Sequence, residues 1–285
     1  MLWRCSTPTT SNNPFATWPR GSSGLGRLGT GLSRIGAILA LGWLLVPGAL
    51  AEAGSDYVGL YAELLADYTQ SVDAEVGTRV DYRGLRDEPR WPVLLGELAT
   101  VEPARLGGRQ EQIAFWINAY NIFAIDLVVR HSPVASIRDI GSFFRSVWKR
   151  EAGSLGVRAY SLDEIEHDIL RPMKEPRIHG AIVCASISCP NLARVPYRAP
   201  TLDAQLDASI RAWLARPEKG LAVDPGAGEL KLSRIFKWFA QDFGGRKGVL
   251  AFVERYAPGA DARWLRENRQ EVDVSYFKYN WGLNE

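Results

Sequence analysis

Cysteine and histidine are scarce in this chain, which has three of each among its 285 residues. These few residues are not spread evenly, because His179, Cys184 and Cys189 all lie within residues 177–190, five positions apart. Imidazole and thiol are the side chains best suited to nucleophilic chemistry and soft-metal binding near neutral pH. The segment 177–190 is therefore the first candidate for a functional site.

Asp, Glu and Lys are absent from residues 1–51, where four arginines are the only charged side chains. An apolar run at 35–45 leads to Ala49 and Ala51, small residues in the pattern of a signal-peptide cleavage site. We expect 1–51 to be a signal peptide and the protein to be periplasmic or secreted, with no membrane association after cleavage. A retained membrane anchor is the alternative. No cysteine comes directly after the apolar run, so the sequence does not support a lipid-anchored bacterial lipoprotein.

An excess of positive charge is absent from the rest of the chain. Of the 34 basic residues four lie in 1–51, which leaves 30 against 32 acidic residues and a net charge of −2. A near-neutral domain with interspersed charges gives no electrostatic reason to bind nucleic acid. The expected partner is an unidentified small molecule or peptide; no cofactor is expected, and the oligomeric state is left open.

Internal repeats and coiled-coil heptads are also absent, which excludes repeat and coiled-coil architectures. The segment 111–131 is apolar on almost every side, as in a helix buried all round. Short candidate strands are scattered between helical segments, the best of them at 178–184, and 221–232 has the pattern of a hairpin. We predict one α+β domain over 52–285, rich in helix, with a few short strands around a buried central helix.

Polar residues interrupt the central apolar segment at three positions. Glu111, Asn118 and Asn121 are spaced by seven and three residues, so they share one face of the helix. Burial of an unpaired amide or carboxylate costs on the order of 1–3 kcal/mol. These side chains must therefore either bond the backbone of a nearby loop or line a cavity, where Asn118 or Glu111 would orient a reacting group or stabilise an oxyanion.

The sequence leaves several pairings of imidazole and thiol open. If His179 and Cys184 lie on one regular strand, they point to opposite faces about 16 Å apart, which disfavours a direct bond. Cys189 follows a turn and can fold back toward His179, or toward His167 from the preceding helix. The two cysteines can instead form a disulfide or be inert core residues. Glu164 and His167, at i and i+3, can also join His179 and a thiolate in a metal site.

Four motifs in order resemble the DUF547 family. They are FWINAYN (115–121), YSLDEIEH (160–167), RIHGAIVCASISCP (177–190) and LDAQL (202–206). VDY at 80–82 and YNWGLN at 279–284 look like flanking parts of the same pattern, so the resemblance spans about 56–285. The family usually has a second proline after Pro190, where this chain has Asn191. The resemblance implies a single-domain bacterial exported protein. It also implies a domain that works in reducing compartments, where a structural disulfide is not the whole reason for a cysteine pair.

These observations lead to the hypothesis of a small thiol-dependent enzyme, a hydrolase or acyl transferase. In it a cysteine is the nucleophile, a histidine is the base, and a polar group of the central helix assists. The candidate catalytic residues are Cys184, Cys189, His179, His167, Asn118 and Glu111. The rival hypothesis is a non-catalytic binding or interaction domain of the cell envelope, with a structural cysteine pair.

Overall fold

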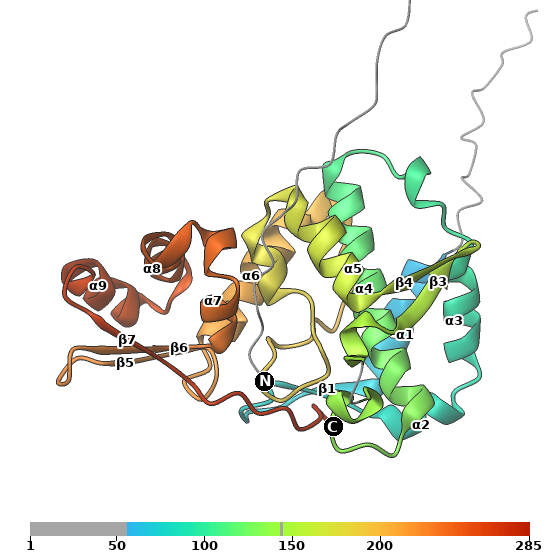
Figure 1. Ribbon diagram of the computed structural model, residues 1–285, viewed down its shortest axis with the longest axis horizontal. Helices are drawn as coiled ribbons and strands as arrows, with labels where there is room; N and C mark the ends of the chain where they lie inside the picture. The colour runs from blue at the N-terminus through green and yellow to red at the C-terminus, as the bar shows by residue number, and fades with distance from the viewer. Residues whose placement is uncertain (1–55, 143–144) are drawn as a thin grey trace, which may run out of the picture. The chain divides into compact units, whose positions relative to one another are not determined.

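The computed structural model of the protein describes residues 56–142 and 145–285. These residues belong to one compact unit, Glu52–Glu285. The predicted signal peptide at 1–51 lies outside the described residues. The described part is rich in helix, with short strands between the helices (Figure 1). The predicted α+β class is therefore confirmed.

Helices provide most of the regular structure. In chain order they are α1 (Tyr57–Tyr68), α2 (Tyr82–Asp87), α3 (Arg90–Ala99), α4 (Arg109–His131), α5 (Leu162–Glu164), α6 (Leu202–Leu214), α7 (Arg234–Trp238), α8 (Gly245–Tyr256) and α9 (Gly259–Asn268). Side-chain caps begin several of them, because the first N–H groups of a helix have no partner inside it. Asp56 accepts from the N–H of Gly59 at 2.9 Å, and Ser161 accepts from that of Glu164 at 3.1 Å.

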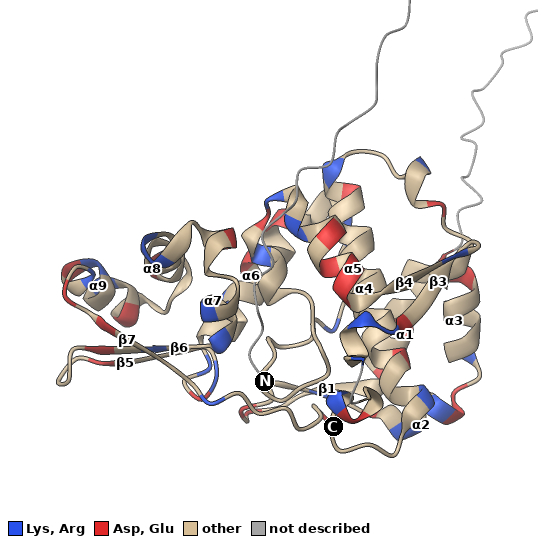
Figure 2. Cartoon of the chain, in the orientation of Figure 1, with Lys and Arg blue, Asp and Glu red and all other residues tan. Residues whose placement is uncertain are grey.

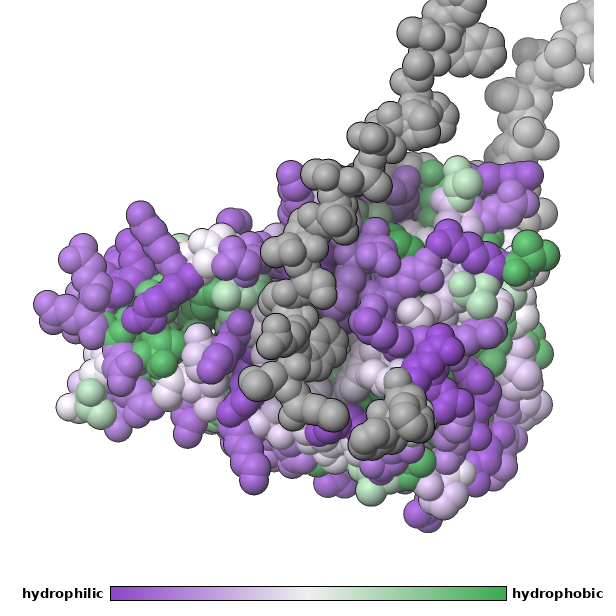
Figure 3. Space-filling model, in the orientation of Figure 1, coloured by the Kyte–Doolittle hydropathy of each residue, from purple (hydrophilic) through white to green (hydrophobic). Residues whose placement is uncertain are grey.

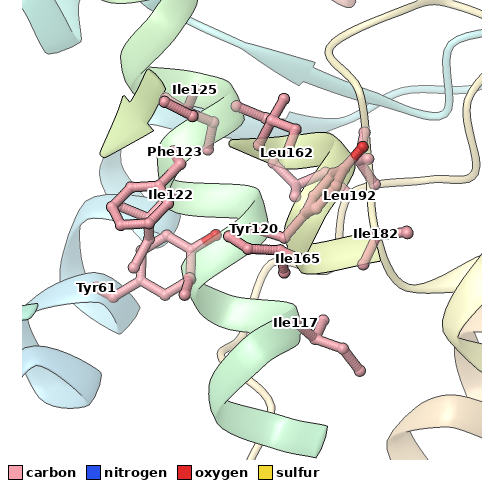
Figure 4. Packing of buried hydrophobic residues seen from close by; sticks show 14 of the residues in the cluster. Tyr61, Ile117, Tyr120, Ile122, Phe123, Ile125, Leu162, Ile165, Ile182 and Leu192 are labelled. Carbon is pink, nitrogen blue, oxygen red and sulfur yellow. The ribbon is translucent and has the colours of Figure 1, made fainter. Parts of the chain in front are cut away.

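Helix α4 is the centre of the main hydrophobic core, and its side chains are buried without interruption from Ile113 to Val129. Figure 4 shows residues of α4 between Tyr61 of α1 on one side and, on the other, Leu162, Ile165, Ile182 and Leu192. Among the described helices α4 alone is long and apolar enough to cross a membrane, but 94% of its most apolar window is buried in the protein. The prediction of a buried central helix is confirmed.

Short strands form small separate sheets in the described part of the chain. They are β1 (Thr69–Ser71) with β2 (Thr78–Val80), β3 (Glu151–Leu155) with β4 (Arg158–Ser161), and β5 (Leu221–Asp224), β6 (Glu229–Leu232) and β7 (Asp273–Tyr276). β5 and β6 form the predicted hairpin, in which Leu221 pairs with Leu232. β7 adds to β6 in parallel, with Tyr276 beside Leu232. Because β7 is paired with β6, the position in space from which the last nine residues, 277–285, leave the sheet is fixed.

A second hydrophobic cluster packs α6, α7 and α8 against the sheet of β5, β6 and β7. Trp213 and Phe236 stack in it with ring centroids 4.9 Å apart. Tyr279, just beyond β7, contacts both this cluster and the core around α4. Outside the two clusters, charges of both signs are interspersed over the helices (Figure 2), and hydrophilic residues cover most of the face seen in Figure 3.

The predicted strand at 178–184 is wrong. Pro176–Gly180 forms a short 3-10 helix, and the residues after it form no sheet ladder. The amide of Asn121 replaces a partner strand, because it donates to the carbonyl of Ala181 (2.9 Å) and accepts from the N–H of Val183 (2.8 Å). A short apolar run indicates that a segment is buried, but it does not determine whether the buried backbone is a strand. Here a polar side chain of α4 satisfies that backbone.

Candidate functional site

Cys184 and Cys189 lie at the two ends of a tight turn, which we call the cysteine loop (residues 184–189). Ala185 has φ of 58°, in the left-handed region that residues with a side chain rarely adopt. The C-terminal segment fastens the loop, since the N–H of Ile187 donates to the carbonyl of Gly282 at 2.8 Å. The turn folds the chain back on itself and brings two cysteines five residues apart into contact.

The two sulfur atoms are the centre of a small hydrogen-bonded group. Cys184 Sγ and Cys189 Sγ are 2.6 Å apart, as free thiols. The backbone N–H of Cys184 donates to Cys189 Sγ at 3.1 Å. The Tyr279 hydroxyl lies 3.2 Å from Cys189 Sγ and 3.7 Å from Cys184 Sγ. Cys189 is buried, whereas Cys184 is partly exposed, so Cys184 is the more accessible residue of the pair.

The same contacts separate the acidities of the two thiols. Burial opposes ionisation of Cys189, but hydrogen bonds from Cys184, Tyr279 and backbone N–H groups outweigh burial and lower its pKa to about 6. The pKa of Cys184 is raised well above its usual value, first by its hydrogen bond to Cys189 and then by burial. The pair therefore loses its first proton near neutral pH and keeps the second, with the proton between the sulfurs. Burial also raises the pKa of Tyr279, which remains a donor.

His179 lies in a different hydrogen-bonded group. Its Nε2 donates to Asp242 Oδ2 at 2.8 Å, and its ring stacks on Phe239 with centroids 4.3 Å apart. Burial lowers the pKa of His179, and Asp242 opposes that shift. His179 and Asp242 line a cavity of about 310 Å³ together with Arg171, Lys174 and Gln241. His179 is thus buried and hydrogen-bonded to the carboxylate of Asp242. In the described part of the chain, no sulfur is among its hydrogen-bond partners.

His167 and Glu166 lie near this carboxylate. His167 Nε2 is 3.8 Å from Asp163 Oδ1, and its Nδ1 is 3.4 Å from the guanidinium of Arg171. Glu166 Oε1 is 4.0 Å from His179 Nδ1, and burial raises the pKa of Glu166 to about 8. Over 56–142 and 145–285, no group of three or more metal-ligating side chains is placed to hold a metal ion. The sulfur atoms bond each other, Ser186 and Tyr279, and neither imidazole.

The polar residues of α4 take separate places. Asn118 is buried, and its side-chain amide binds the backbone of Tyr197. Its Nδ2 donates to the carbonyl of Tyr197 (2.8 Å), and its Oδ1 accepts from the N–H of Tyr197 (2.9 Å). Glu111 is exposed and accepts from the N–H of Gly107 at 2.9 Å. Asn121 holds the backbone that leads into the cysteine loop. Asn118 and Asn121 therefore bond the backbone of nearby loops, which was one of the two alternatives that the sequence left open. Glu111, Asn118 and Asn121 do not converge on one cavity.

The comparison with known families bears on the same residues. Residues 103–214 match a family model described as "Protein of unknown function, DUF547". This segment of the chain belongs to the DUF547 family. The match contains the cysteine loop, His167, His179 and α4, whereas the flanking motifs at 80–82 and 279–284 lie outside it. Comparisons of the chain with curated proteins and with solved structures gave no match.

Sequence reasoning missed two residues of the thiol site. Tyr279 lies 90 residues beyond Cys189, and its only signal was its place in the motif 279–284. Lys219, a buried lysine whose Nζ donates to the carbonyl of Cys189 at 2.6 Å, had no signal at all. Both contacts depend on how distant segments pack.

An aromatic cluster borders the thiols. Tyr279 lies 4.4 Å from Trp281 and 4.9 Å from Trp238 between ring centroids, and Trp148 lies 5.5 Å from Trp281. Trp238 is 44% exposed, and the other three rings are partly exposed. The partly exposed Cys184 thus opens beside aromatic side chains, which offer contact area to an apolar or planar ligand.

Proposed function

We propose that this DUF547 protein carries out thiol–disulfide exchange, with Cys184 and Cys189 cycling between dithiol and disulfide. The observation that carries the proposal is the contact of the two sulfurs at 2.6 Å as free thiols. A disulfide bond is about 2.05 Å long, so oxidation of the pair by a substrate disulfide requires a movement of the sulfurs below an ångström. The lowered pKa of Cys189 supports the proposal, because the thiolate is the reactive form of cysteine.

The proposed roles follow from exposure and acidity. Cys184 attacks one sulfur of a substrate disulfide as its proton passes to the Cys189 thiolate. The Cys184–substrate disulfide forms, the substrate S–S bond breaks, and the first substrate sulfur leaves as a thiolate that takes the proton back from Cys189. Cys189 then attacks Cys184 Sγ and releases the second substrate sulfur as a thiolate. The substrate disulfide is reduced by two electrons, and the protein dithiol is oxidised to a disulfide.

Acyl transfer is the second candidate, because the same nucleophilic sulfur serves it. A thiol hydrolase of the usual kind needs a base beside the sulfur and donors for an oxyanion. The described contacts give Cys189 a hydroxyl and backbone N–H groups but no imidazole. These donors act on the sulfur itself, which favours exchange chemistry over acyl transfer.

The proposal extends to location and substrate. A leader that is cleaved after Ala51 would deliver the domain to the periplasm or the exterior, where disulfides persist. The substrate is then a disulfide in a small molecule or a peptide, and the aromatic cluster beside Cys184 gives it a binding surface. Cell fractionation and the N-terminal sequence of the mature protein test the location.

The test of function uses the chain with Cys5→Ser, so that only the two site thiols remain. The protein is equilibrated in glutathione redox buffers and then alkylated. Mass spectrometry should show two alkylated cysteines in reducing buffer and no alkylated cysteine in oxidising buffer, and the change should be reversible. Cys189→Ser should accumulate a mixed disulfide with glutathione at Cys184, and Cys184→Ser should accumulate far less. A pair that cannot be reduced without unfolding would contradict the proposal and favour a structural role. An acetyl adduct on either cysteine after treatment with p-nitrophenyl acetate, without exchange, would favour acyl transfer.

A further inference from the structure

Lys219 is buried beneath the cysteine loop. It lies between α6 and β5, and its exposed fraction is 1%. Its Nζ donates to the carbonyls of Val76 (2.8 Å), Ile187 (3.2 Å) and Cys189 (2.6 Å). An ammonium group has three N–H donors, and these three carbonyls match them. Two of the three carbonyls belong to the cysteine loop, so the ammonium fixes the end of the loop that carries Cys189.

The charges around Lys219 leave its ammonium without a carboxylate partner in residues 56–142 and 145–285. Glu75 and Glu218 act on it only at longer range, and Arg216 repels it. Arg216 is engaged with Asp73 at 2.8 Å, and Glu75 accepts from the hydroxyl of Ser188 at 3.1 Å. A buried charge normally has a partner of opposite sign.

Cys189 supplies that partner when it is ionised. Burial lowers the pKa of Lys219 to about 8, and the nearby sulfur of Cys189 is the first influence that opposes this. The interaction is reciprocal, because two sites that affect each other's ionisation do so by equal free energies. An ammonium held against the backbone of Cys189 therefore favours the thiolate of Cys189.

We propose that Lys219 is a positioning residue of the thiol site, which holds the cysteine loop by three carbonyls and supplies the positive charge that stabilises the Cys189 thiolate. The inference rests on the proposed thiol–disulfide exchange and adds a second consequence. Formation of the Cys184–Cys189 disulfide removes the negative charge, so oxidation makes the ammonium of Lys219 easier to deprotonate.

The experiment measures the pKa of the Cys189 thiol in Lys219→Met, Lys219→Arg and the exposed control Lys231→Met. All are built in the full chain with Cys5→Ser and Cys184→Ser, and thiolate absorbance is followed against pH, with Cys189→Ser as the blank. Lys219→Met should raise the pKa by at least about one pH unit. Lys219→Arg keeps the charge and should raise it less, and Lys231→Met should leave it unchanged. Equal pKa values in folded Lys219→Met and its parent would overturn the inference.

A second measurement needs no loss of Lys219. The pKa of Lys219 is read by NMR of labelled lysine side chains, with its signal assigned by absence in Lys219→Arg. The pKa should fall in Cys189→Ser and in the oxidised protein; an unchanged value in both would leave only a structural role and overturn the inference. Absence of exchange with glutathione in the parent protein would contradict the proposed function instead, so the two failures are distinguishable.

Discussion

The hydroxyl of Tyr279 lies 3.2 Å from Cys189 Sγ although the two residues are 90 positions apart. Tyr279 also contacts the core around α4 and the core around β5–β7. The residue that donates to the thiolate is therefore fixed by packing on both sides. This arrangement couples the acidity of Cys189 to the seating of the C-terminal segment.

Tyr279→Phe should raise the pKa of Cys189. The substitution keeps the ring and removes one hydrogen bond to the charged form, a loss of about 1.5–3 kcal/mol, or one to two pH units. Thiolate absorbance as a function of pH measures the change. Tyr276→Phe, on β7, is the matched control and should leave the pKa as in the wild type. Equal values for both variants would remove Tyr279 from the site.

Asn121→Ala should disturb the thiols, and Asn118→Ala should not. Each variant loses two hydrogen bonds between α4 and a buried backbone and should be destabilised by about 2–4 kcal/mol. Only Asn121 holds the backbone at Val183, next to Cys184. Urea denaturation measures the loss of stability, and the rate of iodoacetamide alkylation measures the thiols. If Asn118→Ala changed the alkylation rate as much as Asn121→Ala, the effect would come from the general loss of stability and not from the backbone at Val183.

Glu166→Gln should remove a pH dependence of stability. The pKa of Glu166 is about 8 in the folded protein and 4.5 in the reference state, so between these values only the folded protein keeps the proton. The stabilisation is complete below pH 4.5 and is lost as the pH rises toward 8. Glutamine mimics the protonated side chain. The free energy of unfolding of the variant should therefore exceed that of the wild type by at least about 1 kcal/mol at pH 8.5 and equal it near pH 4.5.

The measurement for Glu166→Gln is urea denaturation at pH 4.5, 7 and 8.5. Glu164→Gln is the control, because Glu164 is partly exposed and pairs with Arg158. A stability difference that does not grow with pH for Glu166→Gln would show that this carboxyl group is ionised in the folded protein.

Asp242→Asn should destabilise the protein in a pH-dependent way. Asp242 accepts from Arg171 at 2.6 and 2.8 Å and from His179 at 2.8 Å. Burial opposes its ionisation, but the hydrogen bonds of His179 and Arg171 outweigh burial and lower its pKa. Such a carboxylate stabilises the protein above its unfolded pKa of 3.8, and the stabilisation is lost as the pH falls through the folded value.

The expected cost of Asp242→Asn at pH 7 is about 2 kcal/mol, because the carboxylate is partly exposed and solvent screens it. Thermal unfolding at pH 7 and at pH 3 should show a smaller difference from the wild type at the lower pH. The thiol pKa should change little. A large change in the thiol pKa would instead support His179 as a base for the cysteines, the role that the sequence suggested.

Several parts of the fold could be predicted from local sequence. The apolar run of α4 exceeds what a surface helix allows, so its burial follows from composition alone. The hairpin of β5 and β6 follows from two short apolar segments around a turn. The run at 178–184 was assigned wrongly because strand and irregular backbone have the same composition when both are buried. The amide of Asn121 decided its conformation.

The sequence by itself determined that Cys184 and Cys189 are the chemically distinctive residues of the chain, that α4 is buried, and that the family pattern runs through both. Only the tertiary structure decided that the thiols contact each other and Tyr279, and that Lys219 binds the backbone carbonyl of Cys189. It also decided that His179 pairs with Asp242 and not with a thiol. The physical reason is that periodicity and composition record how deeply a residue is buried. Which atom lies beside a buried sulfur depends on the packing of segments 30 to 90 residues apart.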